Sequence, residues 1–244
     1  MSEPSPADID VEAMNDRLAR EHPIDDYYTR SPWPIRFVEG RRLAIIRRFM
    51  GDVDGLDVAE IGSGGGHVLR MFPTARLTAI DVSGVYLDAA RRKLVGYDVT
   101  FLKGEVDKMD LAEASFDRIV CTEVLEHVVD PDAILAAIAR LLKPTGHAVI
   151  TVPNDPLILR VKGVIRRTPA RRLLGARIDW GGDEFHLHHW TPAEFRRVLA
   201  RHLRVADERA APSRLLPLRA CFKCSAAAQT SGANSTFGEA RPSA

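Results

Sequence analysis

The chain has little cysteine and no long apolar run. Its three cysteines in 244 residues, at positions 121, 221 and 224, are too few for a disulfide framework. No stretch approaches the roughly 18 apolar residues that a transmembrane helix needs. The polar, acidic N-terminus lacks the basic and apolar regions of a secretory signal. We therefore expect a cytoplasmic protein in a reducing environment.

Excess charge is also missing, because the formal net charge is +1 at pH 7. Without a dominant basic surface or a separate RNA-binding module, no nucleic-acid partner is expected. Cys221 and Cys224 form a lone CxxC pair, whereas a structural zinc site needs four ligands. The pair lies in a short apolar run that favours a final strand. A hydrophobic content of 45% is enough for a sizeable core.

The chain has no internal repeat and is expected to form one domain with tails. Residues 1–24 are expected to be a flexible segment, and residues 25–224 the folded domain. Residues 153–190 interrupt that domain as an insertion. The stretch 225–244 is small, polar and nearly free of large apolar groups, so it is expected to be disordered.

Strand and helix patterns alternate through the domain. Strands are predicted at 56–61, 77–80, 99–102, 118–121, 148–152, 203–207 and 218–224; helices are predicted at 36–50, 68–72, 85–94, 132–142 and 193–200. A turn is expected at Lys143–Gly146. This order predicts a doubly wound α/β fold with a mainly parallel, seven-stranded sheet covered by helices on both faces. Such sheets bind ligands at the carboxyl ends of their strands.

A glycine-rich turn follows the first predicted strand, in the run Glu60-Ile61-Gly62-Ser63-Gly64-Gly65-Gly66-His67. Glycines let the backbone turn sharply and let a ligand approach closely. Asp81 ends the next predicted strand, at the spacing where a carboxylate accepts hydrogen bonds from ribose hydroxyls. The pair of features predicts a nucleoside site.

Two classes of nucleoside ligand could fit such a site. A dinucleotide motif has its third glycine where this chain has His67, which disfavours an NAD-dependent dehydrogenase. Glu60 lies just before the turn and would repel a pyrophosphate at the helix N-terminus. A ligand with an ammonium group would tolerate that carboxylate.

The chain resembles the class I S-adenosylmethionine-dependent methyltransferases over about residues 25–210. Glu60–Gly66 looks like their first motif, Ser115–Val120 like the start of their fourth strand, and Leu141–His147 like their LKPGG turn. The resemblance implies S-adenosyl-L-methionine as cofactor and a Rossmann-like fold with a lid inserted after strand five. It implies cofactor contacts at Glu60, Gly62, Ser63, Gly64, Gly66, Asp81, Val82, Glu105, Val106 and Thr122. Glu105 departs from the aspartate usual at its position.

The segment after strand four contains Glu123, Glu126 and His127. Ubiquinone-biosynthesis O-methyltransferases have a similar E-x-x-E-H string associated with a divalent metal, but the same string also shapes the substrate region without metal. No metal is expected here. His127 has a suitable pKa for a general base and is the candidate catalytic residue, with a structural role as the alternative.

The insertion carries seven basic residues and no acid between positions 156 and 178, interleaved with aliphatic residues. Such a segment is typical of a surface for anionic membranes or acidic partners, or of a lid with a solvated basic face. His186, His188 and His189 follow it. Because no matching carboxylate is assured, we interpret these histidines as lining the substrate region, with Trp190 in the core.

Together these features predict an enzyme that methylates O, N or C of a small-molecule, lipid-like or anionic acceptor. The alternative is a methyltransferase-fold binding protein or partner subunit without catalysis. The intact glycine turn and Asp81 argue against that alternative.

Overall fold

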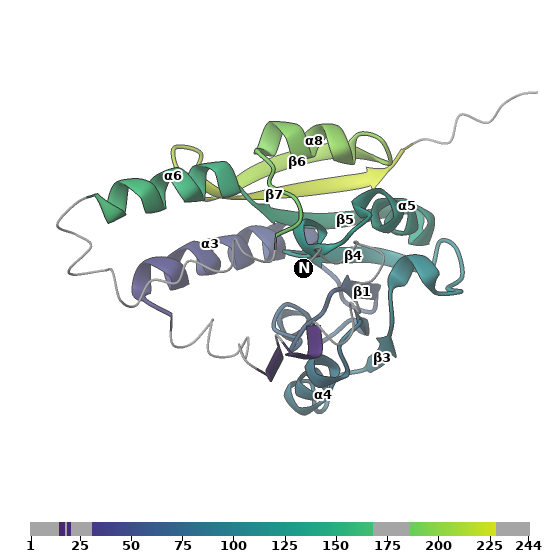
Figure 1. The fold of residues 1–244 in the computed structure, drawn as a ribbon. Coiled ribbons are helices and arrows are strands. Elements are labelled where there is room, and N and C mark those ends of the chain that lie inside the picture. The colour runs from purple at the N-terminus through teal and green to yellow at the C-terminus, as the bar shows by residue number, and fades with distance from the viewer. Residues whose placement is uncertain (1–14, 18, 21–30, 168–185, 228–244) are drawn as a thin grey trace, which may run out of the picture.

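The computed structural model describes residues 15–17, 19–20, 31–167 and 186–227. It contains one seven-stranded sheet in the order β3-β2-β1-β4-β5-β7-β6 (Figure 1). The strands are β1 Asp57–Ile61, β2 Arg76–Asp81, β3 Val99–Lys103, β4 Phe116–Thr122, β5 Leu142–Pro153, β6 Leu203–Pro212 and β7 Pro217–Ala226. The first five pair in parallel, and β7 pairs antiparallel with β5 and β6. The predicted doubly wound, mainly parallel sheet is confirmed.

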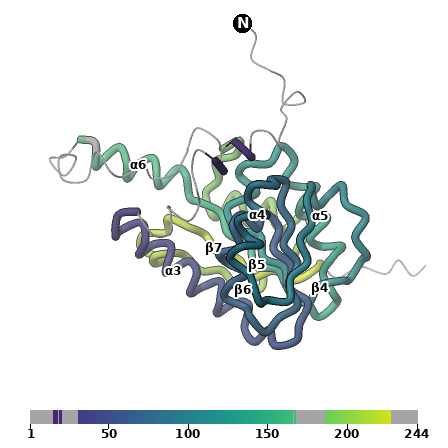
Figure 2. The backbone as a smooth tube through the Cα atoms, turned by 90° about the horizontal axis from the view of Figure 1, so that it is seen from below, coloured from purple at the N-terminus to yellow at the C-terminus, as the bar shows by residue number. Residues whose placement is uncertain are grey.

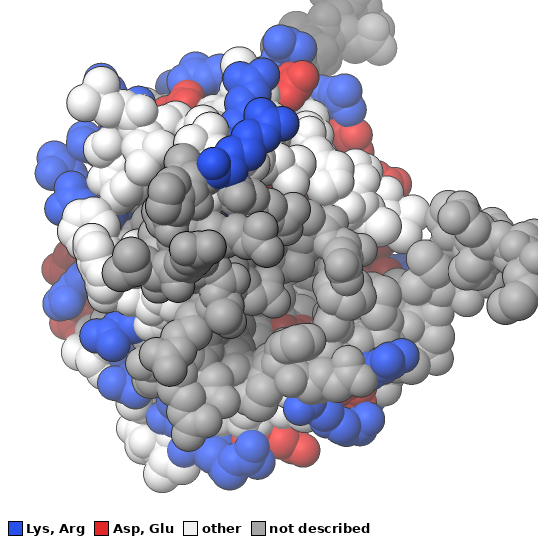
Figure 3. Space-filling model, turned by 60° about the vertical axis from the view of Figure 1, so that its left-hand side comes forward, with Lys and Arg blue, Asp and Glu red and all other residues white. Residues whose placement is uncertain are grey.

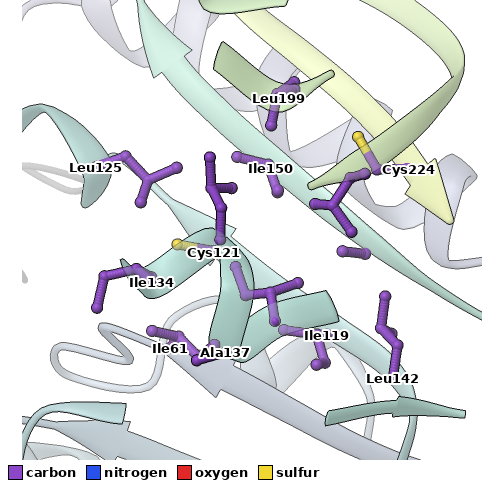
Figure 4. Close-up of a cluster of buried hydrophobic side chains, with 14 of the residues drawn as sticks. Ile61, Ile119, Cys121, Leu125, Ile134, Ala137, Leu142, Ile150, Leu199 and Cys224 are labelled. Atoms are coloured by element: carbon purple, nitrogen blue, oxygen red, sulfur yellow. The ribbon is translucent and has the colours of Figure 1, made fainter. Parts of the chain in front are cut away.

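Helices cover both faces of this sheet. They are α3 Trp33–Met50, α4 Gly84–Lys93, α5 Pro131–Leu141, α6 Asp155–Arg166 and α8 Pro192–Leu199, with short 3-10 helices η2 Leu69–Met71, η3 Val106–Lys108 and η4 Leu125–His127. Side chains of α3 and α4 pack in one hydrophobic cluster, and those of α5 and α8 pack in another. Figure 4 shows the second cluster, in which Ile134 and Leu199 meet the strand residues Ile119 and Ile150. The sheet is therefore buried on both sides, as parallel sheets require.

Helix starts follow the capping residues in the sequence. Ser83 accepts a hydrogen bond from the Tyr86 amide at the start of α4, and Asp130 accepts one from the Ala133 amide at α5. Thr191 and Glu194 form a reciprocal capping box before α8. The Ser83 cap fixes α4 directly after the carboxyl end of β2.

Two local predictions are wrong. Val68–Phe72 was expected to start a helix, but only the 3-10 turn η2 forms, because Pro73 disfavours helical backbone at Phe72. Lys143–Gly146 was expected to be a turn, but it lies within β5. A Cβ on Gly146 would lie 3.0 Å from the Phe116 and Asp117 carbonyl oxygens, so the glycine lets this extended segment approach β4.

The insertion begins as α6, which projects beyond the sheet alongside α3 (Figures 1 and 2). Ile158 of α6 packs with Val38 of α3 and Leu218 of β7. Residues 168–185, which are 18 of the 38 residues of the expected insertion, lie outside the described residues. So do residues 1–14, 18 and 21–30 of the N-terminal region and the tail residues 228–244. β7 runs to Ala226, slightly beyond the expected end of the folded domain. No helix among the described residues is long and apolar enough to cross a membrane.

Candidate active site

The glycine turn lies between β1 and η2, and its conformation depends on glycine. Gly62 has a φ of +68°, and a Cβ there would lie 2.3 Å from the Val124 Cγ2 atom. The amides of Gly62 and Ser63 donate to the Ile80 carbonyl oxygen at 2.9 and 3.0 Å. The turn is thereby fixed against β2 and the segment after β4.

Asp81 joins this turn to the start of α4. Its carboxylate accepts hydrogen bonds from the Gly64 amide at 2.8 Å and the Ser83 amide at 2.9 Å. Burial raises the pKa of Asp81, although both amide hydrogen bonds oppose that shift. The carboxylate is therefore held rigidly where the sequence predicts a ribose contact, with Val82 next to it.

Glu60 is the most unusual group in the turn. Its side chain is buried, and its Oε2 atom has no hydrogen-bond partner among the described residues. Burial raises the pKa of Glu60 well above its ordinary value. A buried carboxylate oxygen without a partner costs free energy, and the ammonium group of a bound amino acid would satisfy it. Ser63 Oγ is likewise buried without a partner, so the turn fits the methionine end of S-adenosylmethionine.

The expected adenine contacts lie at the end of β3. Val106 is buried, whereas Glu105 is partly exposed and forms a 2.7 Å ion pair with Lys108. The Gly104 amide donates to the Asp81 carbonyl oxygen at 3.0 Å, which places this loop beside the ribose position. Glu105 thus already has a partner in the described structure.

The segment after β4 does not bring its three candidate metal ligands together. Glu123, next to Thr122, forms a 2.8 Å ion pair with Arg219 and accepts a hydrogen bond from the Thr151 hydroxyl. Glu126 and His127 instead group with His186, their ligand atoms lying within 4.8 Å of one another. Tertiary contacts therefore separate Glu123 from Glu126 and His127.

His127, the candidate general base, lies in the short helix η4. Its ring meets the His186 ring edge to face, with centroids 4.7 Å apart. The backbone amides of Leu187 and His188 donate to the Glu126 carbonyl oxygen at 2.8 and 3.2 Å. The histidine segment before α8 is therefore fixed against η4, at the carboxyl edge of the sheet.

His188 and Trp190 stack with centroids 4.9 Å apart, and Trp190 packs against the buried Phe195. The expectation that Trp190 contributes to the core is confirmed. The His186 and His189 side chains instead approach the Asp155 carboxylate. Asp155 is not among the site residues predicted from the sequence. The signal that could have found it is its place just beyond the end of the fifth parallel strand, where ligands bind such sheets.

A second set of functional-looking residues was also missed. Arg42 of α3 is buried, forms a 2.7 Å ion pair with Glu39 and donates to the Thr151 hydroxyl at 3.4 Å. Thr151 in turn donates to Glu123. Opposite charges three residues apart on the apolar face of a predicted helix were the signal. The network holds the segment after β4 in place through the hydrogen bond between Thr151 and Glu123.

Comparison with known proteins finds similarity to methyltransferases. Residues 59–150 match the model of a methyltransferase domain. The ubiquinone biosynthesis O-methyltransferase of Alkalilimnicola ehrlichii is 31% identical over 126 residues, 50% of this chain and 51% of that protein. The protein of the same name from Idiomarina loihiensis is 28% identical over 172 residues, 68% of each chain. The chain spans about half the length of most of the curated relatives it matches.

Solved structures show the same fold. The N-methyltransferase NodS from Bradyrhizobium japonicum, in complex with S-adenosyl-L-homocysteine, has a TM-score of 0.62 at 21% identity, covering 86% of this chain and 96% of its own. An S-adenosylmethionine-dependent methyltransferase from Aquifex aeolicus has a TM-score of 0.57 at 16% identity, with coverages of 91% and 98%. The matched domain, the relatives and the fold make the chain similar to class I S-adenosylmethionine-dependent methyltransferases.

Proposed function

We propose that this chain is a catalytically active methyltransferase that moves the methyl group of S-adenosylmethionine to O, N or C of a small-molecule acceptor. The observation that carries the proposal is the buried Glu60 Oε2 atom, which has no hydrogen-bond partner among the described residues and lies beside an intact glycine turn. A binding protein that had lost its cofactor would have no reason to keep this costly group.

In this proposal Glu60, Gly62, Ser63, Gly64 and Gly66 hold the methionine part of the cofactor. Asp81 and Val82 hold the ribose, Glu105 and Val106 contact the adenine, and Thr122 lies beside the reacting end. The cofactor supplies an activated sulfonium methyl group, so the protein contributes mainly alignment and exclusion of water. His127 would accept the acceptor's proton as general base, because it lies after β4 at the edge where ligands bind.

The test is transfer of labelled methyl groups from S-adenosylmethionine to a small-molecule extract, with His127→Gln as the catalytic variant. We expect labelled product from the wild type, a lower turnover from the variant and equal binding of S-adenosyl-L-homocysteine by both. Cofactor binding without any methylated product would instead support the non-catalytic partner subunit. Unchanged turnover in His127→Gln would show that His127 is not the general base, but the chain would still be a methyltransferase.

The acceptor is proposed to be lipid-like or anionic, and the basic segment 156–178 to contact an anionic membrane surface. Arg160 on α6 and Arg167 directly after it are exposed, as are the apolar side chains of Leu159 and Val164. Each basic residue near anionic lipid contributes about 1 kcal/mol, which salt screens. On the face in Figure 3, Lys and Arg side chains lie around the margin with Asp and Glu between them.

Sedimentation with vesicles tests this contact. We expect the wild type to bind anionic vesicles at low salt and to leave them at high salt. A variant with Arg166, Arg167, Arg171 and Arg172 changed to Gln should not bind. A control with Arg47, Arg48, Arg91 and Arg92 changed to Gln loses the same charge from exposed positions on α3 and α4. Equal losses in both variants would show that only net charge matters.

A further inference from the structure

Two imidazoles converge on one buried carboxylate beside the candidate active site. The Nδ1 atoms of His186 and His189 lie 2.8 and 3.1 Å from the same Asp155 atom, Oδ2. The Asp155 side chain is 1% exposed, and its other oxygen, Oδ1, is buried without a hydrogen-bond partner among the described residues. The carboxylate that the two imidazoles share therefore keeps one oxygen, Oδ1, without a hydrogen-bond partner among the described residues.

We propose that Asp155, His186 and His189 form a binding site for one divalent transition-metal ion of the zinc class. The potential ligand atoms of the three residues lie within 4.8 Å of one another. In a tetrahedral zinc site, neighbouring ligand atoms lie about 3.3 Å apart. Separations of 2.8 and 3.1 Å need to widen by only a few tenths of an ångström to admit the ion.

The surrounding structure holds the three ligands in place before an ion arrives. Asp155 is the first residue of α6, directly after the end of β5. The histidine segment is fixed separately by the hydrogen bonds of Leu187 and His188 to the Glu126 carbonyl oxygen. His186 is nearly buried, with a side chain 12% exposed, whereas His189 is 43% exposed. An ion held there would keep an open position towards solvent or a small ligand.

The ligand set selects the kind of ion. Two imidazoles and one carboxylate suit zinc, cobalt or nickel, whereas magnesium and calcium prefer oxygen ligands. The cysteines do not compete for such an ion, because all three are buried and burial raises the pKa of Cys221 and Cys224 to about 12. The proposed site shares His186 with the group formed by Glu126 and His127, but its carboxylate is Asp155.

Zinc titration of tag-free, EDTA-treated full-length protein by calorimetry tests the proposal. We expect one Zn²⁺ per chain, no saturable binding of Mg²⁺, and affinity at least ~10-fold weaker in His186→Gln, His189→Gln and Asp155→Asn. The matched control is His188→Gln, because His188 stacks on Trp190 and its Nε2 contacts the Val128 carbonyl oxygen instead. This control should bind zinc as the wild type does.

Binding of S-adenosyl-L-homocysteine by each variant reports folding and the nucleoside site separately. His189→Gln is the ligand variant least expected to disturb folding, since the His189 side chain is nearly half exposed. No saturable zinc binding by the wild type would overturn the proposal, and so would equal weakening by His188→Gln and His189→Gln. Zinc binding by a chain that transfers no methyl group would still support it, so the two proposals fail independently.

Discussion

At the scale of single residues, three buried carboxylates lie at the carboxyl edge of the sheet in different states. Asp81 accepts hydrogen bonds from two backbone amides, and Asp155 Oδ2 lies against two imidazoles. Glu60 Oε2 and Asp155 Oδ1 have no hydrogen-bond partner among the described residues. Because burial without a partner is costly, a ligand that pairs with the Glu60 carboxylate would offset part of that cost.

Glu60→Gln should flatten the dependence of stability on pH. Burial raises the pKa of Glu60 in the folded chain above its unfolded value of about 4.3. The stability it contributes is therefore complete below the unfolded pKa and is lost as pH rises through the folded pKa. Urea denaturation between pH 4 and 8 should show the free energy of unfolding falling less with pH in Glu60→Gln than in the wild type. The exposed control Glu113→Gln should follow the wild type.

Asp81→Ala should weaken binding of S-adenosyl-L-homocysteine by about 2–3 kcal/mol, since hydrogen bonds to a charged group are lost. It should also lower the melting temperature, because the Gly64 and Ser83 amides lose their acceptor. Calorimetry measures the affinity. Asp88→Ala removes an exposed carboxylate of α4 and should change neither quantity. An unchanged affinity in Asp81→Ala would mean that the ribose binds elsewhere.

At the scale of elements, the close fit between the β1 turn and the segment after β4 shapes the proposed nucleoside site. Gly62 and Val124 come from these two segments, and their closeness leaves no room for a Cβ. α4 closes the turn from the other side, where Leu94 and Ala90 lie against Gly66. A substitution in the turn therefore disturbs three elements together.

Gly62→Ala should be more destabilising than Gly96→Ala. Both glycines have positive φ, +68° and +86°, so both substitutions strain the backbone by about 1 kcal/mol or more. Only Gly62 adds a clash, because nothing lies within 4 Å of a Cβ on Gly96. Thermal denaturation of the two variants isolates the clash, and Gly62→Ala should also lose cofactor affinity. Equal losses of stability would show that Val124 simply moves aside.

At the scale of the whole molecule, a buried charge network joins α3, β5, β7 and the segment after β4. It contains Glu39, Arg42, Glu123, Thr151 and Arg219. The side chains of Glu39 and Arg42 are only 4% and 3% exposed. Removing one charge from such a network leaves its partner buried and uncompensated.

Arg42→Met should lower the free energy of unfolding by about 3–5 kcal/mol. Adding Glu39→Leu to this variant should recover part of the loss, since the carboxylate that has lost Arg42 is removed as well. Urea denaturation of the wild type, both single variants and the double variant forms a complete cycle. A double variant whose loss equals the sum of the single losses would show that the two charges do not interact.

The sequence by itself determined the α/β class, the positions of most strands and helices, and the glycine turn with Asp81. These features are local, because hydrophobic periodicity, caps and backbone freedom act over a few residues. The errors at Val68–Phe72 and Lys143–Gly146 were of another kind. A following proline shortened the first, and pairing with β4 extended the second.

Only the tertiary structure decided which side chains share a site. Glu123 is three residues from Glu126 in sequence, yet it forms its ion pair with Arg219 of β7. His186 and His189 lie over 30 residues from Asp155, yet share its carboxylate. Such partnerships arise where different segments end at one edge of the sheet, and no periodicity encodes them. The sequence therefore predicted the nucleoside turn, and the packing of the chain assembled the histidine cluster.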